Sequence, residues 1–267
     1  MEISQVKTLI AISDRLKLLV LEVQELAILS FQAITGMFKR PRYLGDTMEQ
    51  MDLLGVGSLA IVVLTGLFAG MAMALQLSVE LAVYGAQIHL GKAVTVTIVR
   101  EMGPVLTALM VAGRVCSGIA AELGAMKVGQ QIDALRVMGV DPVKKLVIPR
   151  LLSVLVMLPV LTVISDAIAT LGGYVIGVLV NHQSSPVYWS SVGQAFTFKN
   201  LLGGLIKPFV FGFIIAMVGC YYGLQTIGGT RGVGKATTHA VVTASILILV
   251  SNFLITKLVI SLVGWRG

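Results

Sequence analysis

Residues 93–150 read AVTVTIVREMGPVLTALMVAGRVCSGIAAELGAMKVGQQIDALRVMGVDPVKKLVIPR. The first half is apolar enough to lie in a membrane, yet it carries Arg100, Glu101 and Arg114. Ionisable side chains inside a membrane span are costly, so each of them is a candidate functional residue. The stretch therefore predicts a membrane protein that places charges within one of its spans.

The composition of the whole chain agrees with this prediction. Of its 267 residues, 56% are hydrophobic and 12% are charged, and the mean hydropathy is +0.92. Soluble domains carry about a quarter charged residues. Five segments approach the roughly 20 residues that a bilayer requires. They are residues 53–78, 94–121, 151–180, 201–224 and 240–263. We expect an all-α integral membrane protein with no sizeable soluble domain, whose third span tilts or breaks at Pro159 or at Gly172-Gly173.

The segment before these spans, residues 4–36, has charges at helical spacing. One half of its helical wheel is polar and the other half is apolar. The polar half holds Lys7, Asp14, Arg15, Lys17, Glu22, Gln24 and Glu25, and the apolar half holds Leu9, Ile12, Leu16, Leu19, Val23 and Leu26. We expect a helix that lies in the membrane interface, with a helix packed on a soluble partner as the alternative. Residues 1–45 would then form this helix and a linker, and residues 46–267 the transmembrane domain.

The distribution of basic residues predicts the orientation of the spans. Basic residues are frequent before span one, between spans two and three, and between spans four and five. The opposite loops, 79–93 and 181–200, carry only Lys92 and Lys199. The positive-inside rule places the N-terminus in the cytoplasm and the C-terminus outside. The net charge of +7 thus reflects topology, and we expect no nucleic-acid partner.

Several kinds of active site are excluded by the motifs. Residues 229–235, GTRGVGK, match the start of a phosphate-binding loop, but Ala236 replaces the Ser or Thr that holds magnesium, and no strand precedes them. His89, His182 and His239 lack metal-ligand spacing, so we expect no metal. The chain offers no nucleophile paired with a base, and we expect it not to be an enzyme and to hold no cofactor of its own.

Four charged residues are predicted to lie at one depth. With a rise of about 1.5 Å per residue, Arg100 and Glu101 in span two, Lys207 in span four and Lys257 in span five all lie roughly 10 Å below the outer ends of their spans. A hydrated cavity at that level would hold an anionic headgroup, with apolar walls for acyl chains. The alternative is that the lysines extend to the outer interface and one of them pairs with Glu101, which we favour for Lys257. Gly103-Pro104 permits an irregular helix beside such a cavity.

Two further charges are assigned to structure. Asp166 lies near the middle of span three and is expected to pair with a base or to accept a hydroxyl hydrogen bond, with a relay role as the alternative. Arg114 lies toward the cytoplasmic side and is expected to reach Glu122. Small-residue spacings at Gly66/Gly70 and Gly173/Gly177 permit close helix contact, within the subunit or across a dimer.

The segment Met126–Met138 has the pattern of a short amphipathic helix. Val128, Ile132 and Leu135 recur on one face, and Gly139 and Asp141-Pro142 follow it. One interpretation is an interfacial loop helix; the other is a coupling helix, within about residues 124–140, that docks in a groove of a cytoplasmic motor. Together with the charges in the span, the second interpretation indicates a transporter subunit driven by another protein.

Three motifs resemble one family. REMGPVLTALMVAGR, AAELGAMKVGQQIDAL and MGVDPVKKLVIPR are similar to the MlaE (YrbE) permease family of ABC lipid transporters. The resemblance implies a homodimeric permease in a bacterial inner membrane that moves phospholipids between that membrane and the outer envelope and maintains outer-membrane lipid asymmetry. It also implies a cytoplasmic ABC ATPase that binds ATP and magnesium, a periplasmic hexamer of MCE-domain proteins and a STAS-domain accessory protein.

The resemblance also implies two sets of site residues. The ATPase contact falls on Gln130, Gln131, Ile132, Asp133, Ala134 and Leu135. Gln130 departs from the family's usual Glu-Gln, which removes an expected ion pair. The lipid cavity would involve Arg100 and Glu101, with Met73, Leu77, Leu81 and Tyr84 as acyl-chain walls, and the depth comparison adds Lys207 to the lipid-binding residues. The alternative function is a proton-coupled secondary transporter or channel that uses Asp166 and Glu101, although the chain has no evident inverted repeat.

Overall fold

The described part of the chain is built from helices. The computed structural model describes the backbone of residues 2–37 and 43–263, and the side chains of residues 17, 20–37 and 43–261. Within these residues there is no strand, and five helical runs are long and apolar enough to cross a membrane. The runs are Leu44–Val83, Gln87–Val128, Val143–Leu179, Phe198–Leu224 and Gly229–Ser261. The prediction of an all-α membrane protein with five spans is confirmed.

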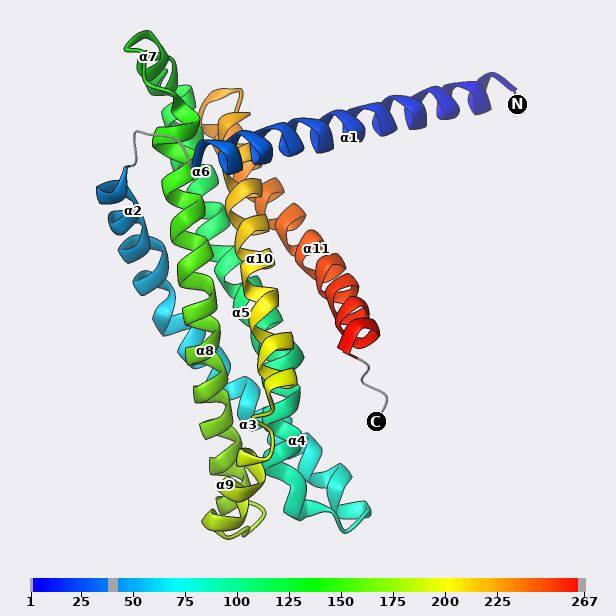
Figure 1. The fold of residues 1–267 in the computed structure, drawn as a ribbon. Helices are drawn as coiled ribbons and strands as arrows, with labels where there is room; N and C mark the ends of the chain where they lie inside the picture. The colour runs from blue at the N-terminus through cyan, green and yellow to red at the C-terminus, as the bar shows by residue number, and fades with distance from the viewer. Residues whose placement is uncertain (1, 38–42, 264–267) are drawn as a thin grey trace.

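The spans alternate in direction between the two ends of the bundle (Figure 1). Span one comprises α2 (Leu44–Gln50), η1 (Met51–Gly55), η2 (Val56–Ser58) and α3 (Leu59–Val83), and η3 (Gln87–His89) begins span two. Span two continues through α4 (Leu90–Thr97), η4 (Ile98–Met102), α5 (Gly103–Val111), η5 (Ala112–Cys116) and α6 (Ser117–Val128). The later elements are α7 (Gln131–Val137), η6 (Val143–Val147), α8 (Ile148–Leu179), α9 (Ser185–Gly193), α10 (Phe198–Leu224) and α11 (Gly229–Val263).

Span two is interrupted by two π-helical turns. η4 contains Arg100 and Glu101, and η5 contains Arg114. A π turn inserts an extra residue into a helix and occurs frequently at functional sites. The first π turn ends directly before Gly103-Pro104. The irregularity that Gly103-Pro104 permits therefore lies in the five residues directly before this pair, and both π turns coincide with charges inside the span.

Span three does not break where the sequence allowed it. α8 is one continuous helix of 32 residues that passes through Pro159 and Gly172-Gly173, so the prediction of a break at either place is wrong. A side chain at Gly172 would meet the Leu67 carbonyl of α3, and one at Gly173 would meet Tyr188. These glycines therefore serve close packing of α8 against α3 and Tyr188.

Close packing of α3 on α8 forms the wall of the bundle. A Cβ at Gly66 would collide with Ser165, and a Cβ at Gly70 would overlap the backbone of Ala169. Helices that carry small residues at this spacing approach each other closely in a membrane. The Gly66/Gly70 pair therefore mediates a contact within the subunit.

The short helix α9 closes the end of the bundle opposite α7 (Figure 1). Its Tyr188 is fully buried, lies against Gly173 and Gly177 of α8, and donates a hydrogen bond to the Thr170 carbonyl at 3.1 Å. Burial raises the pKa of this phenol to about 12. The Gly173/Gly177 spacing therefore serves a contact within the subunit as well.

α1 (Glu2–Met37) lies crosswise to the spans, at the end of the bundle that carries α7 (Figure 1). It is attached near its C-terminal part, where Ala33 is fully buried and Glu25 accepts hydrogen bonds from Tyr221 and Gln225 of the α10 end at 3.1 and 2.9 Å. Lys7, Leu9, Ile12, Asp14, Arg15, Leu16 and Leu19 have side chains outside the described residues. The interfacial position of α1 stays a prediction.

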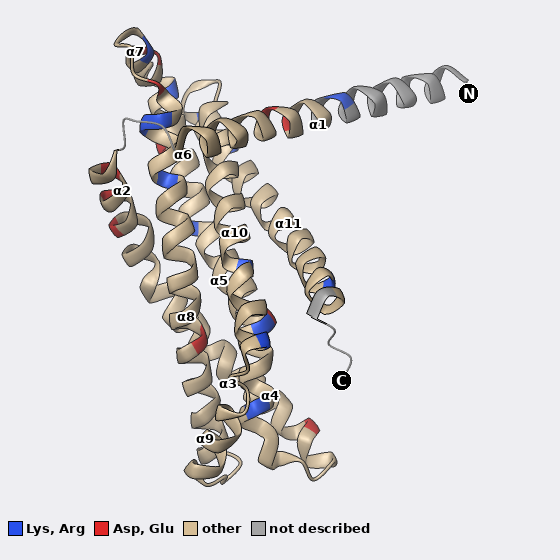
Figure 2. Cartoon of the chain, viewed as in Figure 1, with Lys and Arg blue, Asp and Glu red and all other residues tan. Residues whose placement is uncertain are grey.

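The core lies between α6, α8 and α10, whereas α3 and α11 have exposed apolar faces. α11 buries Ala236, Ala240, Ala244 and Ile248 at regular fourth positions and exposes Ile246, Val250 and Phe253. Charged residues concentrate at the end that carries α7, and only a few lie along the bundle (Figure 2). The exposed apolar faces of α3 and α11 suit contact with lipid tails or with another apolar helix.

The α3–α8 contact gives a stability prediction. Gly70→Ala should lower the free energy of unfolding by about 1–3 kcal/mol, because the new methyl group forces the two backbones apart. Thermal unfolding of the purified chain in detergent would measure it. Gly118→Ala is the matched control: it is exposed in α6 with open space at its Cβ position, and it should be neutral or stabilising by about 0.5–1 kcal/mol. Equal midpoints for the two variants would contradict the assignment.

Candidate functional site

A buried ion pair lies inside the bundle at the level of η4. The ammonium of Lys207 in α10 is 2.7 Å from the Glu101 carboxylate, and the Lys207 side chain is only 2% exposed. The same ammonium donates a hydrogen bond to the Arg100 carbonyl at 2.7 Å. Lys207 is therefore bonded to both residues that the sequence places at its own depth, which confirms the depth comparison for these three positions.

Glu101 also connects this pair to the last span. It accepts a hydrogen bond from Thr256 at 3.1 Å and one from Asn252 at 3.3 Å, both of α11. Lys257 follows Thr256 and is exposed, as the sequence predicted for a lysine that extends away from the cluster. Asn252 and Thr256 were missed at the sequence level, because neutral side chains give no hydropathy signal. The available clue was that the two residues are four positions apart and therefore share one face of the helix.

A glycine allows α10 to approach η4 so closely. A Cβ at Gly204 would overlap the Val99 carbonyl. Gly204 lies one helical turn before Lys207, so the close approach brings the lysine to the Arg100 carbonyl and to Glu101. The side chains of Arg100 and Glu101 are half-buried, whereas that of Lys207 is enclosed. The side chains of Arg100 and Glu101 thus remain partly accessible, while Lys207 is the enclosed member of the cluster.

The predicted acyl-chain walls lie on the outer half of α3. Met73, Leu77 and Leu81 are half-buried, and Leu77 and Leu81 pack against Ala74 and its neighbours in a small apolar cluster. Tyr84 follows the last residue of α3 and is 80% exposed. The hydrogen bonds and the ion pair of Glu101 come from α10 and α11. A role of the α3 residues in holding lipid stays a prediction.

The predicted coupling helix is shorter than expected. Gln130 adopts a left-handed backbone conformation with φ of 57°, which separates α6 from α7. Met126 to Val128 therefore belong to the end of span two, and the free-standing helix is Gln131–Val137. A continuous helix from Met126 to Met138 is wrong, because a left-handed residue cannot continue a right-handed helix.

The apolar face of α7 points into the chain itself. Ile132 is 1% exposed and Leu135 packs on the core, which differs from the expectation that Val128, Ile132 and Leu135 present one face to a partner. The exposed apolar residues are Val137 and Met138, at 89% and 68%. Val137 and Met138 follow the predicted contact residues in the sequence. Of those predicted residues, Gln130, Gln131 and Ala134 are exposed. Asp133, another of them, lies 3.4 Å from both Lys127 and Arg136.

A second ion pair fixes this end of the bundle. Arg150, at the start of α8, is 4% exposed and lies 2.7 Å from Glu122 of α6. It also donates to the Leu146 carbonyl at 2.8 Å. The expected pair of Arg114 with Glu122 is wrong. Arg114 instead donates to the Ser58 hydroxyl at 2.7 Å, because η5 faces the start of α3.

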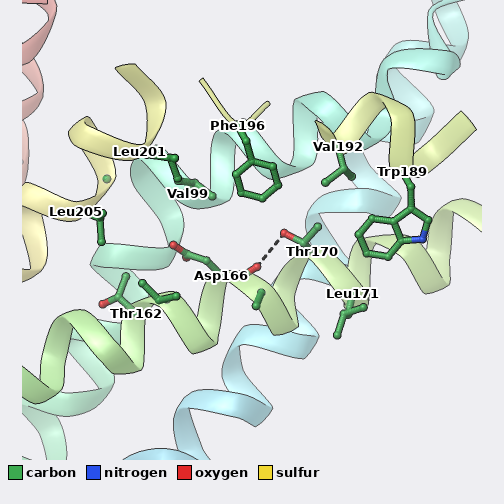
Figure 3. Close-up of a pocket in the computed structure, with 13 residues that line it drawn as sticks. Val99, Thr162, Asp166, Thr170, Leu171, Trp189, Val192, Phe196, Leu201 and Leu205 are labelled. Carbon is green, nitrogen blue, oxygen red and sulfur yellow. Dashed lines mark hydrogen bonds between the residues drawn. The ribbon is translucent and has the colours of Figure 1, made fainter. Parts of the chain in front are cut away.

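Asp166 has neither of its expected partners. Among the described residues it makes no ion pair, and its Oδ1 oxygen is buried without a hydrogen bond. It lines a cavity of about 390 Å³ between η4, α8, α9 and α10 (Figure 3). The expected pairing with a base or a hydroxyl group is therefore wrong for this oxygen.

The excluded site classes can be compared with the structure. Residues 229–235 form the first turns of α11, and the preceding residues contain no strand, so the context of a phosphate-binding loop is missing. Within the residues that the structure describes, no three His, Cys, Asp or Glu side chains group to hold a metal. The free thiols of Cys116 and Cys220 are both buried in the core.

Known proteins match this chain over most of its length. The family model described as Permease MlaE matches residues 47–258. A probable ABC transporter permease of Rickettsia typhi is 43% identical over 87% of this chain and 90% of its own. The intermembrane phospholipid transport system permease protein MlaE of Haemophilus influenzae is 34% identical over 85% and 88%. The chloroplastic protein TRIGALACTOSYLDIACYLGLYCEROL 1 of Arabidopsis thaliana is 33% identical over 86% of this chain and 66% of its own.

The Lys207–Glu101 pair predicts an asymmetric response to mutation. Glu101→Gln should lower the free energy of unfolding by up to about 3–5 kcal/mol, because the enclosed ammonium loses its counter-charge. Lys207→Met should have a smaller effect, because half-exposed Glu101 keeps Thr256 and Asn252. The double variant should recover part of the loss. Unfolding of the four proteins in detergent measures the coupling, and additive losses would show that the pair does not interact.

Proposed function

We propose that this chain, which belongs to the MlaE permease family, moves phospholipid as the membrane subunit of an ABC-type transporter. Family membership makes it an ABC-type permease and a multi-pass membrane protein, not the ATPase. The phospholipid cargo is supported by the Haemophilus influenzae relative, whose name states that cargo. We place the chain in a bacterial inner membrane, where transport to or from the outer envelope would maintain outer-membrane lipid asymmetry.

One observation carries the proposal: Arg100 and Glu101 lie half-buried within span two, supported by the enclosed Lys207. An arginine guanidinium binds phosphate through two parallel hydrogen bonds, which suits a phospholipid headgroup. A carboxylate beside it suits the ammonium or hydroxyl groups that such headgroups carry. In this proposal Arg100 and Glu101 meet the headgroup, Lys207 orients Glu101, and Met73, Leu77, Leu81 and Tyr84 line the path of the acyl chains.

The proposed assembly has two copies of the chain. The exposed apolar faces of α3 and α11 are suited to pair with a second copy, and α11 also supplies Thr256, which bonds to Glu101. Two copies would place two Arg100–Glu101 pairs around one cavity. On the outer side we propose an MCE-domain hexamer that receives the lipid, and on the cytoplasmic side a STAS-domain protein that accompanies the ATPase.

Energy would enter at α7. A partner ABC ATPase would hold ATP and magnesium, and this chain would hold no cofactor of its own. α7 projects from the end of the bundle (Figure 1). Gln131, Ala134 and Val137 of α7 and the flanking residues Gln130 and Met138 are exposed. The Glu122–Arg150 pair joins the adjoining end of α6 to α8, so movement of α7 would pass to spans two and three together.

Reconstitution tests the function as a whole. The chain, purified with its ATPase and MCE partners in proteoliposomes, should move a fluorescent phospholipid only when ATP is hydrolysed. Transport that follows a proton gradient without the ATPase would instead support a secondary transporter that uses Asp166 and Glu101.

The lipid-binding role gives a separate prediction. Arg100→Ala should lower the yield of photo-crosslinked phospholipid by roughly tenfold or more, because a charge-assisted bidentate bond to phosphate is lost. Crosslinking in intact cells, followed by mass measurement of the attached lipid, reads this out. Arg231→Ala is the control, since Arg231 is exposed at the start of α11 far along the chain from the cluster. Equal crosslinking in both variants would contradict the headgroup role.

The proposed coupling role of α7 gives a further testable prediction. Val137→Asp with Met138→Asp should lower lipid-stimulated ATP hydrolysis and lipid transport by roughly tenfold while the chain remains folded, because both side chains are exposed and a desolvated docking contact would be lost. Ile132→Ala should instead destabilise the chain, by about 2–5 kcal/mol, because Ile132 is buried in its own core. Unchanged hydrolysis and transport in an assembled complex with the two Asp substitutions would remove these residues from the contact.

A further inference from the structure

The cavity at Asp166 is separate from the Lys207–Glu101 pair and has the size of a small-molecule site. Its volume of about 390 Å³ falls within the roughly 300–1,000 Å³ of ligand pockets. The lining is almost entirely apolar: Val99 and Leu201 on one side and Val192 on another, with Thr162 and Thr170 as the neutral polar residues. Within that lining Asp166 is the single charged residue.

The carboxyl group of Asp166 receives no hydrogen bond from the hydroxyl groups around it. Thr162 donates to the Leu158 carbonyl at 2.8 Å, and Thr170 donates to the backbone carbonyl of Asp166, also at 2.8 Å (Figure 3). Both hydroxyl hydrogens are therefore engaged by backbone. The buried Oδ1 oxygen is left without a partner. A buried carboxyl oxygen in this position is costly unless something else compensates it.

The backbone around the carboxyl group is shaped to keep it in place. A Cβ at Gly103 would overlap Oδ1 of Asp166, so a larger residue there would displace the carboxyl group from its position. Gly103 directly follows the π turn η4. The space for the carboxyl group thus arises from a glycine and an irregular helix. A polar group accommodated in this way, inside a membrane span, is a candidate binding group.

The cavity opens sideways toward the lipid side of the bundle. Val163, Leu171 and Leu205 are exposed apolar residues of its lining. Trp189 of α9 and Phe196, just after α9, are exposed aromatic residues that face the cavity from the α9 end (Figure 3). Aromatic faces attract cations, and an arriving ligand would pass them before it reached Asp166.

We propose that this cavity binds a lipophilic organic cation, a protonated amine with an apolar body, whose N–H group donates to Asp166. The apolar walls bury the body of the ligand, the aromatic rim attracts its charge, and the carboxylate forms a neutral pair with it. A simple acyl chain fills the same walls but offers no positive charge to the Asp166 carboxylate. Charge complementarity therefore selects the amine over an uncharged chain of equal length.

Binding of a matched pair of ligands tests this. The chain has two tryptophans, Trp189 and Trp265, and Trp265 lies outside the described residues. In a Trp265→Phe background, Trp189 is the only reporter. The full chain in nanodiscs of neutral lipid is titrated with a tail-brominated dodecylamine and, separately, with the matching brominated dodecanol. The amine should quench Trp189 saturably, with an affinity roughly tenfold to a hundredfold above that of the alcohol, as a charge-assisted hydrogen bond provides.

Two substitutions distinguish amine binding by the Asp166 carboxyl group from a general attraction of the protein for amines. Asp166→Asn should reduce the amine affinity to that of the alcohol and leave the alcohol unaffected. Glu80→Gln, which removes an exposed carboxylate near the outer end of α3, should change neither. Equal affinities of amine and alcohol for the unsubstituted Asp166 protein would overturn the proposal and assign the cavity to acyl chains. An unchanged amine affinity in folded Asp166→Asn would overturn it too. The amine–alcohol comparison decides the question even if the variant fails to fold.

Discussion

Burial of a charged amine inside a membrane span is the constraint around which this bundle is arranged. An ammonium with 2% of its side chain exposed requires a counter-charge and further hydrogen-bond acceptors, and Lys207 finds them in Glu101 and in the Arg100 carbonyl. To provide them, span two carries a π turn, α10 carries a glycine one helical turn before the lysine, and α11 supplies Thr256 and Asn252. Three spans are thereby held in register at one level. Loss of Glu101 would leave the enclosed Lys207 ammonium without a counter-charge in a medium of low dielectric constant.

Close backbone packing holds the two remaining spans, one and three, together. α3 and α8 approach each other where Gly66 and Gly70 meet Ser165 and Ala169, and α8 meets Tyr188 of α9 through Gly173 and Gly177. Apolar side chains gain little by leaving lipid for another apolar helix, so small residues that permit many short contacts provide the attraction instead. This division explains why the same chain uses glycine in its spans for packing at some positions and for making room for a polar group at Gly103 and Gly204.

Span two links the two ends of the molecule. Span two provides Glu101 from η4, Arg114, which bonds to Ser58, from η5, and Glu122, which pairs with Arg150, from α6. The chain then turns at Gln130 into α7. Each of these polar contacts joins span two to a different neighbour: α10 and α11, the start of α3, and α8. The proposed headgroup site therefore lies within span two, and the proposed motor contact directly follows the end of that span. The Asp166 cavity lies beside span two, because Val99 of η4 lines it.

Hydropathy and the constant helical rise depend only on residue order, so they were enough to predict the all-α class, the five spans and the common depth of Arg100, Glu101 and Lys207. Gly103-Pro104 also indicated that the helix could be irregular nearby, and the π turn lies directly before this pair. The tertiary structure alone decided which charges pair: Arg150 with Glu122, Arg114 with Ser58, and Asp166 with no described partner. It decided too that α8 stays unbroken and that Ile132 faces inward while Val137 and Met138 face outward. These outcomes depend on the rotation of each helix about its axis and on the neighbour it meets. A single left-handed residue at Gln130 is enough to change the direction in which the apolar face of α7 points, and hydrophobic periodicity in the sequence does not encode that change.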